Sequence, residues 1–512
     1  MRIAFRTDSS MQMGTGHLLR CLTFADELGR RGYEIMFICR ELEGNVSSMA
    51  RDRGYACAML PAPTAFNKAA EADDGAPAHA GWLGVPQHLD AEQTIAVMEQ
   101  SGEPFDWLIV DHYALDARWE EMLRCRCKQL MVIDDLADRP HECDLLLDQN
   151  LYPDLEHRYS GLIGEACRTL LGPSFALLRP EFARERRQLR SRSGEVRRIL
   201  VFFGGVDAKN ETLRALRALS LIEDARLSVD VVIGKSNPHE KVLRHYCEAR
   251  RDICLHVQSP HIAELMVASD LAIGAGGVTT WERCAVGLPA IAWPLAENQR
   301  DVIGAAADVG ALYAPDSDSV TNVGDLSAHL AALLRSTHLC RHMGKQAASL
   351  CDGQGTRRVA DHIAPTEVVF RVARLSDCEN VYRWRDHPTT RNSSIESNPI
   401  PYETHRTWFQ RALVDPCKIL LIAEREGSPV GVLRYDLKAE VAVVSIYLVP
   451  GQAGKGIGIA MLRAGETWLS EKHPEIELIQ AVVLGNNSSS KALFEKCGFL
   501  KRQIVFEKVH QK

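Results

Sequence analysis

The chain has 512 residues, of which 46% are hydrophobic and 25% are charged, and its formal net charge is −7. These values are ordinary for a globular protein, and the negative charge argues against a general nucleic-acid or membrane-surface binder. The length predicts about three domains. Fifteen cysteines without a C-x-x-C pair, and no leader-like or spanning apolar run, predict a reduced, cytoplasmic protein.

Short apolar segments alternate with helical patterns over the first 170 residues, which predicts a parallel sheet covered on both faces. We expect strands at residues 3–6, 35–39, 107–110 and 130–133. Polar residues follow each strand, as they do where ligands bind at the carboxyl ends of strands. Residues 61–84, rich in Ala, Pro, Gly and Asp, are interpreted as an irregular insertion or mobile loop.

Residues 14–17, Gly-Thr-Gly-His, lie between the first strand and the first helix. Gly14 and Gly16 let the backbone approach a phosphate, and the helix start offers unpaired N–H groups. His17 is a residue type that accepts protons near neutral pH. A packing turn with an incidental histidine is the competing interpretation of this motif.

A stretch with seven arginines, residues 184–198, favours a solvated helix and interdomain connection over a polyanion site. A second α/β unit then follows, with strands expected at 199–203, 229–233, 253–256 and 271–275 and helices to about 363. We therefore predict two Rossmann-like domains, 1–180 and 181–363, that enclose a cleft.

Two glycine turns in this second unit suit a diphosphate: Gly204-Gly205, and the run 274–280 that contains Gly276, Gly277 and Thr279. Glu282, one helical turn later, could accept both ribose hydroxyls, although a surface glutamate near a helix start is the simpler alternative. Asn298, in an expected loop, is a candidate contact for uracil or sugar.

Beyond residue 365 the pattern changes to β-rich segments at 419–424, 430–436 and 441–449. A glycine-rich run at 451–458 and a helix at 460–469 follow. This predicts a third, α+β domain at 366–512.

The first 360 residues resemble the UDP-sugar hydrolases of pseudaminic acid biosynthesis. The resemblance is carried by the text at 6–21 (RTDSSMQMGTGHLLRC), 106–113, 133–150, 171–182, 202–210 and 274–282. It implies a glycosyltransferase B-like fold, removal of UDP from UDP-2,4-diacetamido-2,4,6-trideoxy-β-L-altrose, and His17 as catalytic base. One base acting on water predicts inversion. The sequence shows no clustered carboxylates that suit a diphosphate-bound cation, so we expect no metal requirement. Asp8, Asp111 and Tyr113 are expected to orient His17 or the sugar, and His112 is the rival base.

The third region resembles the GNAT superfamily of N-acetyltransferases, with acetyl-CoA as co-substrate. Its pyrophosphate loop is 453–458, with Ala453 where Gln or Arg is usual, and 487–499 matches the closing motif. Phe494 stands where the family often has a tyrosine general acid, and phenylalanine cannot donate a proton. Either another group or water protonates the thiolate, or Tyr447 on the neighbouring strand is the general acid; a degenerate acyltransferase is the further alternative. The expected CoA contacts are Leu448, Gly454, Lys455, Gly456, Ile457, Gly458, Asn487 and Ser490.

The fusion itself favours two consecutive steps, because 4-N-acetylation precedes UDP removal in the pathway that the first region resembles. Residues 382–391 and 405–408 also resemble that acetyltransferase subgroup, and Glu396 and His405 are candidate bases or sugar contacts. A glycosyltransferase joined to an acetyltransferase, or to an inactive binding module, is the alternative. The sequence leaves the oligomeric state open.

Overall fold

The computed structural model describes residues 1–64, 75–187, 192–222, 226–363, 368–394, 398–425, 427–453, 457–485 and 487–501. The chain divides into two compact units, Met1–Val359 and Ala360–Lys512. The domain boundaries predicted at 180 and 363 stay predictions. Within the described residues, no helix combines the length and the apolarity needed to cross a bilayer.

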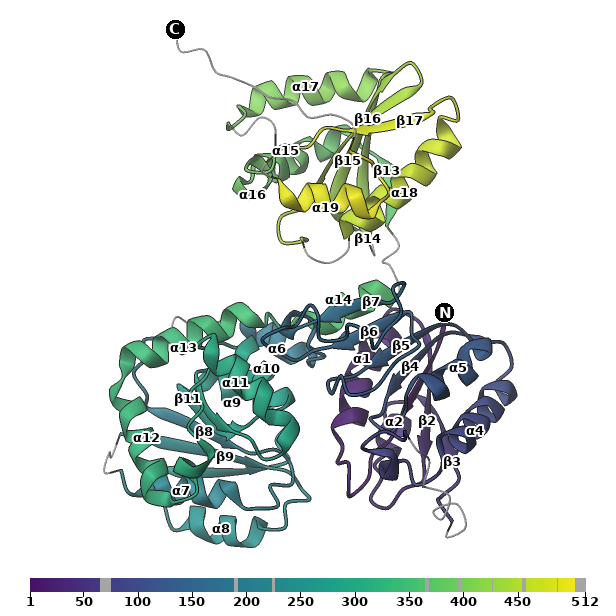
Figure 1. The fold of residues 1–512 in the computed structure, drawn as a ribbon. Coiled ribbons are helices and arrows are strands. Elements are labelled where there is room, and N and C mark those ends of the chain that lie inside the picture. Colours follow the sequence, from purple (N-terminus) through teal and green to yellow (C-terminus); the bar gives the residue numbers. More distant parts are fainter. Residues whose placement is uncertain are drawn as a thin grey trace. The chain divides into compact units, whose positions relative to one another are not determined.

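The first sheet has the strand order β3-β2-β1-β4-β5-β6-β7, and its neighbouring strands pair in parallel. The order reverses between β1 and β4, so the connections after these two neighbouring strands lead in opposite directions. Helices α1, α2, α4 and α5 accompany this sheet (Figure 1). Its elements are β1 (Arg2–Thr7), α1 (Gly16–Arg30), β2 (Glu34–Arg40), α2 (Ser48–Asp52), β3 (Ala56–Leu60), η1 (Ala80–Trp82), α4 (Gln87–Gln100), β4 (Phe105–Asp111), α5 (Ala117–Leu123), β5 (Cys127–Ile133), β6 (Leu145–Asp148) and β7 (Arg168–Leu171).

The second sheet has the order β10-β9-β8-β11-β12, again with parallel neighbours, and reverses between β8 and β11. Its elements are α6 (Pro180–Arg186), β8 (Arg198–Phe202), α7 (Glu211–Ser220), β9 (Ser228–Ile233), α8 (Glu240–Glu248), β10 (Ile253–Val257), α9 (Ile262–Ala268), β11 (Leu271–Ala275), α10 (Val278–Ala285), β12 (Ala290–Trp293), η4 (Glu297–Gln299), α11 (Arg300–Asp308), α12 (Val323–Arg335), α13 (Thr337–Leu350) and α14 (Gly355–Ile363).

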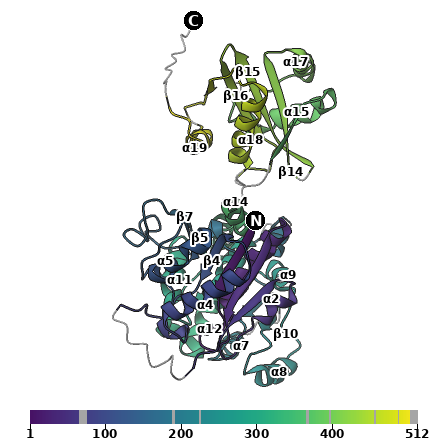
Figure 2. The ribbon, with the colours of Figure 1, turned by 90° about the vertical axis from the view of Figure 1, so that its right-hand side faces the viewer.

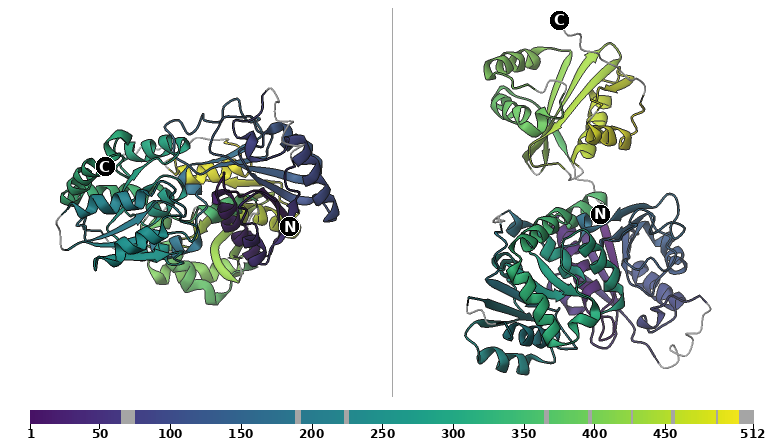
Figure 3. Two further views of the ribbon diagram at one scale, coloured as in Figure 1. Left: turned by 90° about the horizontal axis from the view of Figure 1, so that it is seen from below. Right: turned by 60° about the vertical axis from the view of Figure 1, so that its left-hand side comes forward.

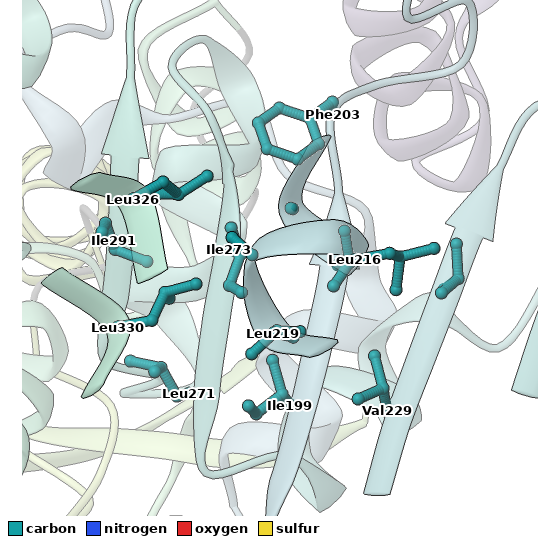
Figure 4. Packing of buried hydrophobic residues seen from close by; sticks show 14 of the residues in the cluster. Ile199, Phe203, Leu216, Leu219, Val229, Leu271, Ile273, Ile291, Leu326 and Leu330 are labelled. Atoms are coloured by element: carbon teal, nitrogen blue, oxygen red, sulfur yellow. The ribbon is translucent and has the colours of Figure 1, made fainter. Parts of the chain in front are cut away.

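Apolar strand residues of the second sheet build its core against helices α7 and α12. Ile199 and Ile273 from the central strands are fully buried, and Leu216 and Leu330 from the two helices pack in the same cluster. Figure 4 shows these side chains between the strands and helices. Continuous apolar strands of this kind are expected where both faces of a parallel sheet are covered. The rigid sheet then fixes where the loops at its carboxyl edge begin.

The second unit holds a mostly antiparallel sheet in the order β13-β14-β15-β16-β17. Helices α15 and α17 cover one face, and α18 and α19 cover the other (Figure 2; Figure 3, right). The elements are β13 (Val369–Val372), α15 (Cys378–Asp386), α16 (Pro388–Arg391), α17 (Tyr402–Val414), β14 (Lys418–Arg425), β15 (Ser428–Lys438), β16 (Val441–Leu448), α18 (Ile457–Lys472), β17 (Leu478–Ala481) and α19 (Ser488–Lys496).

The arginine-rich stretch is not simply a solvated connection. Arg186 donates to the backbone carbonyls of Ala285, Ala348 and Cys351, which lie at helix ends, and Arg192 donates to the carbonyl of Met266. Carbonyls at helix C-termini lack intrahelical partners, so these guanidinium groups satisfy them. Residues 188–191 of the stretch lie outside the described residues.

Candidate functional site

His17 lies in the first turn of α1, at the place where the first sheet reverses its strand order. Strand β1 leads into the turn before α1, and its neighbour β4 ends at Asp111, which pairs with Thr7 across the two strands. Ligands of open α/β sheets bind at the carboxyl edge at such a reversal. A tight turn precedes the helix: Gly14 has a φ of +75°, and its N–H donates to Ser10 O at 2.9 Å. A Cβ atom on Gly14 or Gly16 would meet no heavy atom within 4 Å, so both glycines border open space.

The His17 ring is held by Asp111. Nδ1 of His17 lies 2.6 Å from Asp111 Oδ1, and His17 is 7% exposed. Because a carboxylate only accepts hydrogen bonds, Nδ1 carries the hydrogen, and in the neutral ring Nε2 then holds the lone pair that can accept a proton. Arg20 binds both oxygens of the same carboxylate, at 2.6 and 2.7 Å. Burial alone would raise the pKa of the Asp111 carboxyl, but Arg20 and His17 hold that pKa well below its usual range.

Asp8 and His112, at the ends of the same two strands, form a second buried pair. Asp8 is fully buried; it accepts from the Arg40 N–H at 2.6 Å and lies 2.7 Å from Arg6 Nη1. His112 Nε2 lies 3.3 Å from Asp8, while its Nδ1 accepts from the Ala114 N–H at 3.1 Å. Burial lowers the pKa of His112. Nδ1 is bound to the backbone, and Nε2 is buried beside Asp8 without a hydrogen bond of its own, so neither ring nitrogen of the rival base is exposed to a ligand.

A chain of hydrogen bonds continues from Arg20 toward the second sheet. Arg20 donates to Asp135 Oδ2 at 3.1 Å, and the Tyr113 hydroxyl donates to Asp135 Oδ1. Asn150 Nδ2 also donates to Asp135, at 3.3 Å, and Asn150 Oδ1 accepts from the Trp281 indole of α10 at 2.9 Å. The ring of Tyr113 also contacts the ring of His17, with 4.5 Å between their centroids.

The second sheet places both predicted glycine turns at its own reversal. Gly204-Gly205 follows β8, Gly276-Gly277 follows β11, and these strands are neighbours. Gly204 has a φ of +89° and Gly277 a φ of +93°, which favour glycine. A Cβ atom on Gly204 would meet nothing within 4 Å, so the turn after β8 borders open space.

Helix α10 begins at the second of these turns. Its N-cap residue, Gly277, provides no side-chain hydrogen bond, which leaves first-turn N–H groups for a ligand. Thr279 is partly exposed, whereas the Thr280 hydroxyl accepts from Arg283 Nη2 at 3.1 Å. Arg283 is 3% exposed and, among the described residues, has no carboxylate at ion-pair distance. Burial lowers its pKa to about 10, so it stays cationic at neutral pH.

The other predicted nucleotide contacts lie near this turn. Glu282 is buried, 3.5 Å from Arg179 Nη2, and burial raises the pKa of its carboxyl. Asn298 is exposed in η4. The next residue, Gln299, packs so closely that its Cβ would lie 3.1 Å from a Cβ on Gly276. These positions suit the predicted roles but stay predictions.

Among the described residues, one group of side chains has metal-ligand chemistry: Asp230, Cys254 and His256, whose donor atoms lie within 4.8 Å of one another. They occupy strands β9 and β10. His256 Nε2 lies 2.8 Å from Asp230, which also accepts from Arg198 at 2.6 Å. Asp230 is therefore already engaged by two cationic or hydrogen-bonding groups.

In the C-terminal unit, Ala360–Lys512, Tyr447 of β16 lines a cavity of about 300 Å³. The cavity lies on the face covered by α15 and α17, and Arg385, His405 and Arg434 also line it. Burial raises the pKa of the Tyr447 hydroxyl. Nε2 of His405 is buried without a hydrogen-bond partner, and burial lowers the pKa of this imidazole.

Strands β16 and β17 pair in parallel only over Val441–Val444 and Leu478–Ala481. Within the described residues, the last four residues of β16, including Leu448, have no strand partner on that side. Their backbone groups can therefore pair with an extended ligand. Helix α18 starts at Ile457, which is 1% exposed, and Gly458 packs against Leu493. Gly454, Lys455 and Gly456 lie outside the described residues, as does Glu396.

The closing segment of this unit has mainly structural contacts. Asn487 caps α19 by accepting from the Ser490 N–H at 3.0 Å, and its Nδ2 donates to Ser393 O at 3.0 Å. Phe494 is 8% exposed and packs against Phe499 in the core that includes α18. Phe494 has no hydroxyl and packs in this core, so it cannot act as the general acid. Asn487 and Ser490 remain predicted CoA contacts.

Residues 379–499 match the model of the acetyltransferase (GNAT) family. An uncharacterized protein of Methanocaldococcus jannaschii is 24% identical over 98% of this chain and 97% of its own length. The UDP-2,4-diacetamido-2,4,6-trideoxy-beta-L-altropyranose hydrolase of Campylobacter jejuni is 26% identical over 53% of this chain and 83% of its own. The structure of Acinetobacter baumannii MurG superposes with a TM-score of 0.50 at 15% identity, over 71% of this chain and 99% of MurG.

The chain is a fusion of a glycosyltransferase B-like region with a GNAT-family domain. The predicted fold class is confirmed for both parts. The GT-B-like region contains the two parallel sheets, and the GNAT domain contains the mostly antiparallel sheet.

Sequence reasoning missed several residues around His17. Arg20 and Asp135 are charged residues whose roles appear only through their contacts with Asp111 and Tyr113. Trp82, from the segment interpreted as an irregular or mobile loop, lies 6.5 Å from His17 between ring centroids. A lone tryptophan beside a glycine in an Ala- and Pro-rich segment was the available signal.

Proposed function

We propose that the GT-B-like region hydrolyses a UDP-sugar and that the GNAT domain acetylates the amino precursor of that sugar. The observation that carries the hydrolase proposal is the pair formed by His17 and Asp111 at the reversal of the first sheet. Asp111 fixes the tautomer and orientation of the imidazole, which is the arrangement a general base requires.

The second sheet supports UDP as the leaving group. The α10 N-terminus, preceded by Gly276 and Gly277, offers N–H groups to a diphosphate. Arg283, from the last turn of the same helix, donates to Ala275 O and to the Thr280 hydroxyl, so its buried guanidinium adds positive charge near the turn that precedes α10. Both features stabilise the negative charge that develops on UDP as it leaves.

The proposed reaction is a single displacement. Nε2 of His17 takes a proton from water while the water oxygen bonds to the anomeric carbon. The bond from that carbon to the UDP oxygen breaks, the electron pair leaves with UDP, and the configuration at the anomeric carbon inverts. No sugar–enzyme bond and no metal ion are required for this step.

The identity of the sugar is proposed from the Campylobacter relative, whose printed name specifies the diacetamido-trideoxy-altropyranose. The product would then enter pseudaminic acid biosynthesis. Asp8 and His112 form a buried pair at the strand ends, whereas Tyr113 borders the base. Glu282 and Asn298 are the proposed ribose and uracil contacts.

In the GNAT domain we propose that acetyl-CoA pairs with the open edge of β16 and that the amine enters the cavity lined by Tyr447. The amine nitrogen bonds to the thioester carbonyl carbon and passes one proton to His405, the candidate base that lines the same cavity. The C–S bond breaks, and Tyr447 gives its proton to the departing thiolate. The fusion raises the local concentration of the second active site around the acetylated product.

The test is incubation of the purified protein with the 4-amino UDP-sugar and acetyl-CoA, with no sugar acceptor. We expect acetylation followed by stoichiometric release of free sugar and UDP. His17→Asn should slow UDP release by at least ~10²-fold while UDP binding and acetyl transfer stay near the wild-type level. UDP release that needs an added acceptor would support a glycosyltransferase and contradict hydrolysis. Absence of acetyl transfer, with UDP release intact, would indicate that the GNAT domain is a binding module.

A further inference from the structure

A group of aromatic rings surrounds His17 on the side of the segment that precedes α4. The centroids of His79 and Trp82 are 4.5 Å apart, Trp82 and Tyr113 are 5.7 Å apart, and His79 and Tyr113 are 5.5 Å apart. His17 contacts Tyr113 at 4.5 Å and Trp82 at 6.5 Å, in both cases edge to face. Three rings from outside α1 therefore lie beside the proposed base.

The segment that carries His79 and Trp82 is fixed at its end. Gly84, with a φ of +72°, packs so closely on Pro63 that a Cβ atom would lie 2.5 Å from its ring. The neighbouring Leu83 and Val85 are buried in the core of the first sheet. The short helical turn of η1 is closed by the Trp82 N–H, which donates to His79 O at 2.9 Å. The position of the indole is therefore set by packing.

These rings keep surface for a ligand. His79 and Trp82 are only partly buried, whereas Tyr113 is 7% exposed and its hydroxyl is bound to Asp135. The Nδ1 side of His17 is occupied by Asp111. A sugar whose anomeric carbon meets water at Nε2 must therefore lie beside the His17 ring, within reach of its aromatic neighbours.

We propose that Trp82, supported by His79, is the specificity-determining wall of the sugar site in the GT-B-like region. An indole face packs against methyl and C–H groups and gains less from hydroxyl groups. The wall therefore favours sugars with apolar substituents, such as a 6-deoxy methyl group and acetamido methyl groups, over fully hydroxylated sugars. This inference rests on the proposed hydrolysis, because His17 defines where the sugar lies.

The first experiment compares Trp82→Ala and Trp82→Phe with the wild type. The kcat/KM for UDP release is measured with the UDP-diacetamido-trideoxy sugar and with UDP-N-acetylglucosamine. We expect Trp82→Ala to lower kcat/KM for the deoxy sugar by at least ~10-fold, the scale of a lost apolar contact in a specificity pocket. The ratio of kcat/KM for the deoxy sugar to kcat/KM for UDP-N-acetylglucosamine should fall by a similar factor. Trp82→Phe should keep most of the wild-type kcat/KM and most of this ratio.

Two controls separate a local effect from general damage. UDP affinity, measured by calorimetry, should be unchanged in Trp82→Ala because the proposed nucleotide contacts lie at the second sheet. His79→Ala should lower kcat/KM a few-fold, whereas His88→Ala, at an exposed histidine of α4, should have no effect. A Trp82→Ala protein whose kcat/KM and sugar preference both lie within twofold of the wild type would overturn the inference.

The second experiment does not depend on turnover. In a His17→Asn background, saturation-transfer NMR reports which protons of the bound UDP-sugar contact the protein. We expect strong transfer to the sugar methyl protons with Trp82 present and a loss of that signal, relative to the uracil protons, with Trp82→Ala. Unchanged methyl signals would overturn the inference even if the wild type releases no UDP, and such inactivity would by itself contradict only the proposed hydrolysis.

Discussion

The indole of Trp281 donates a hydrogen bond to Asn150 at 2.9 Å, and this bond connects α10 with the acidic network of the first sheet. Asn150 donates in turn to Asp135, which also accepts from Arg20. Arg20 donates a hydrogen bond to Asp111, the residue that orients the proposed base. The helix proposed to bind the diphosphate and the support of the base thus share one continuous chain of hydrogen bonds.

The first prediction concerns this connection. Asn150→Ala should lower the free energy of unfolding by about 1–3 kcal/mol, because it leaves the buried Trp281 N–H without an acceptor. Trp281→Phe removes that N–H, so the Asn150 substitution should cost less in the Trp281→Phe background. Denaturant unfolding of the two single variants and the double variant measures the coupling, and strictly additive effects would show that the bond contributes nothing.

Asp111→Asn should lower kcat for UDP release by at least ~10²-fold, because the amide neither carries the charge that stabilises protonated His17 nor fixes its tautomer as firmly. UDP affinity should be retained, which calorimetry can check. Asp106→Asn is a matched control on the same strand, since Asp106 pairs with Lys128 outside the site. Equal losses in both variants would point to damage of β4 and not to a role in proton transfer.

Asp148 makes stability depend on pH. Burial, with Asp135 nearby, raises its pKa from 3.8 to about 7. Between about pH 4 and pH 7 the folded protein keeps a proton that the unfolded chain has released, so this group makes the free energy of unfolding fall as the pH rises. Asp148→Asn removes this dependence. The melting temperature of the variant relative to wild type should therefore increase from pH 5 to pH 8, and a constant difference would contradict the shift.

Tyr447→Phe should lower kcat for acetyl transfer by at least ~10-fold if its hydroxyl protonates the thiolate of CoA. UDP release from the acetylated sugar should not change. Tyr435→Phe is the control, because Tyr435 is a buried tyrosine of β15 that packs on the opposite face of the same sheet. Unimpaired acetyl transfer by Tyr447→Phe would remove this residue from the reaction.

Local sequence signals were sufficient for the elements that build the sites. The apolar run before Gly14 predicted β1, and the run before Gly276 predicted β11. A short, continuous apolar segment followed by a glycine turn is typical of a buried strand. The edge strands β3, β7, β12, β13 and β17 were not predicted. Each has only four or five residues, which is too short for a period-2 pattern to distinguish it from a loop.

Long-range contacts explain what the sequence could not supply. Asp8 was expected beside His17 at the strand ends, and the structure engages its carboxylate with Arg6 and a backbone N–H of β2. Such pairings depend on strand order, which periodicity does not reveal. The approach of Trp82 to His17 likewise depends on how the segment before α4 packs on the first sheet.

The most direct test of the account is hydrolysis of the UDP-sugar in ¹⁸O-labelled water, followed by mass spectrometry and by NMR at early times. A water molecule activated by His17 places the label on the anomeric carbon of the released sugar, with the anomer first formed inverted, and leaves UDP unlabelled. Label in UDP, or a first product of retained configuration, would contradict the proposed displacement.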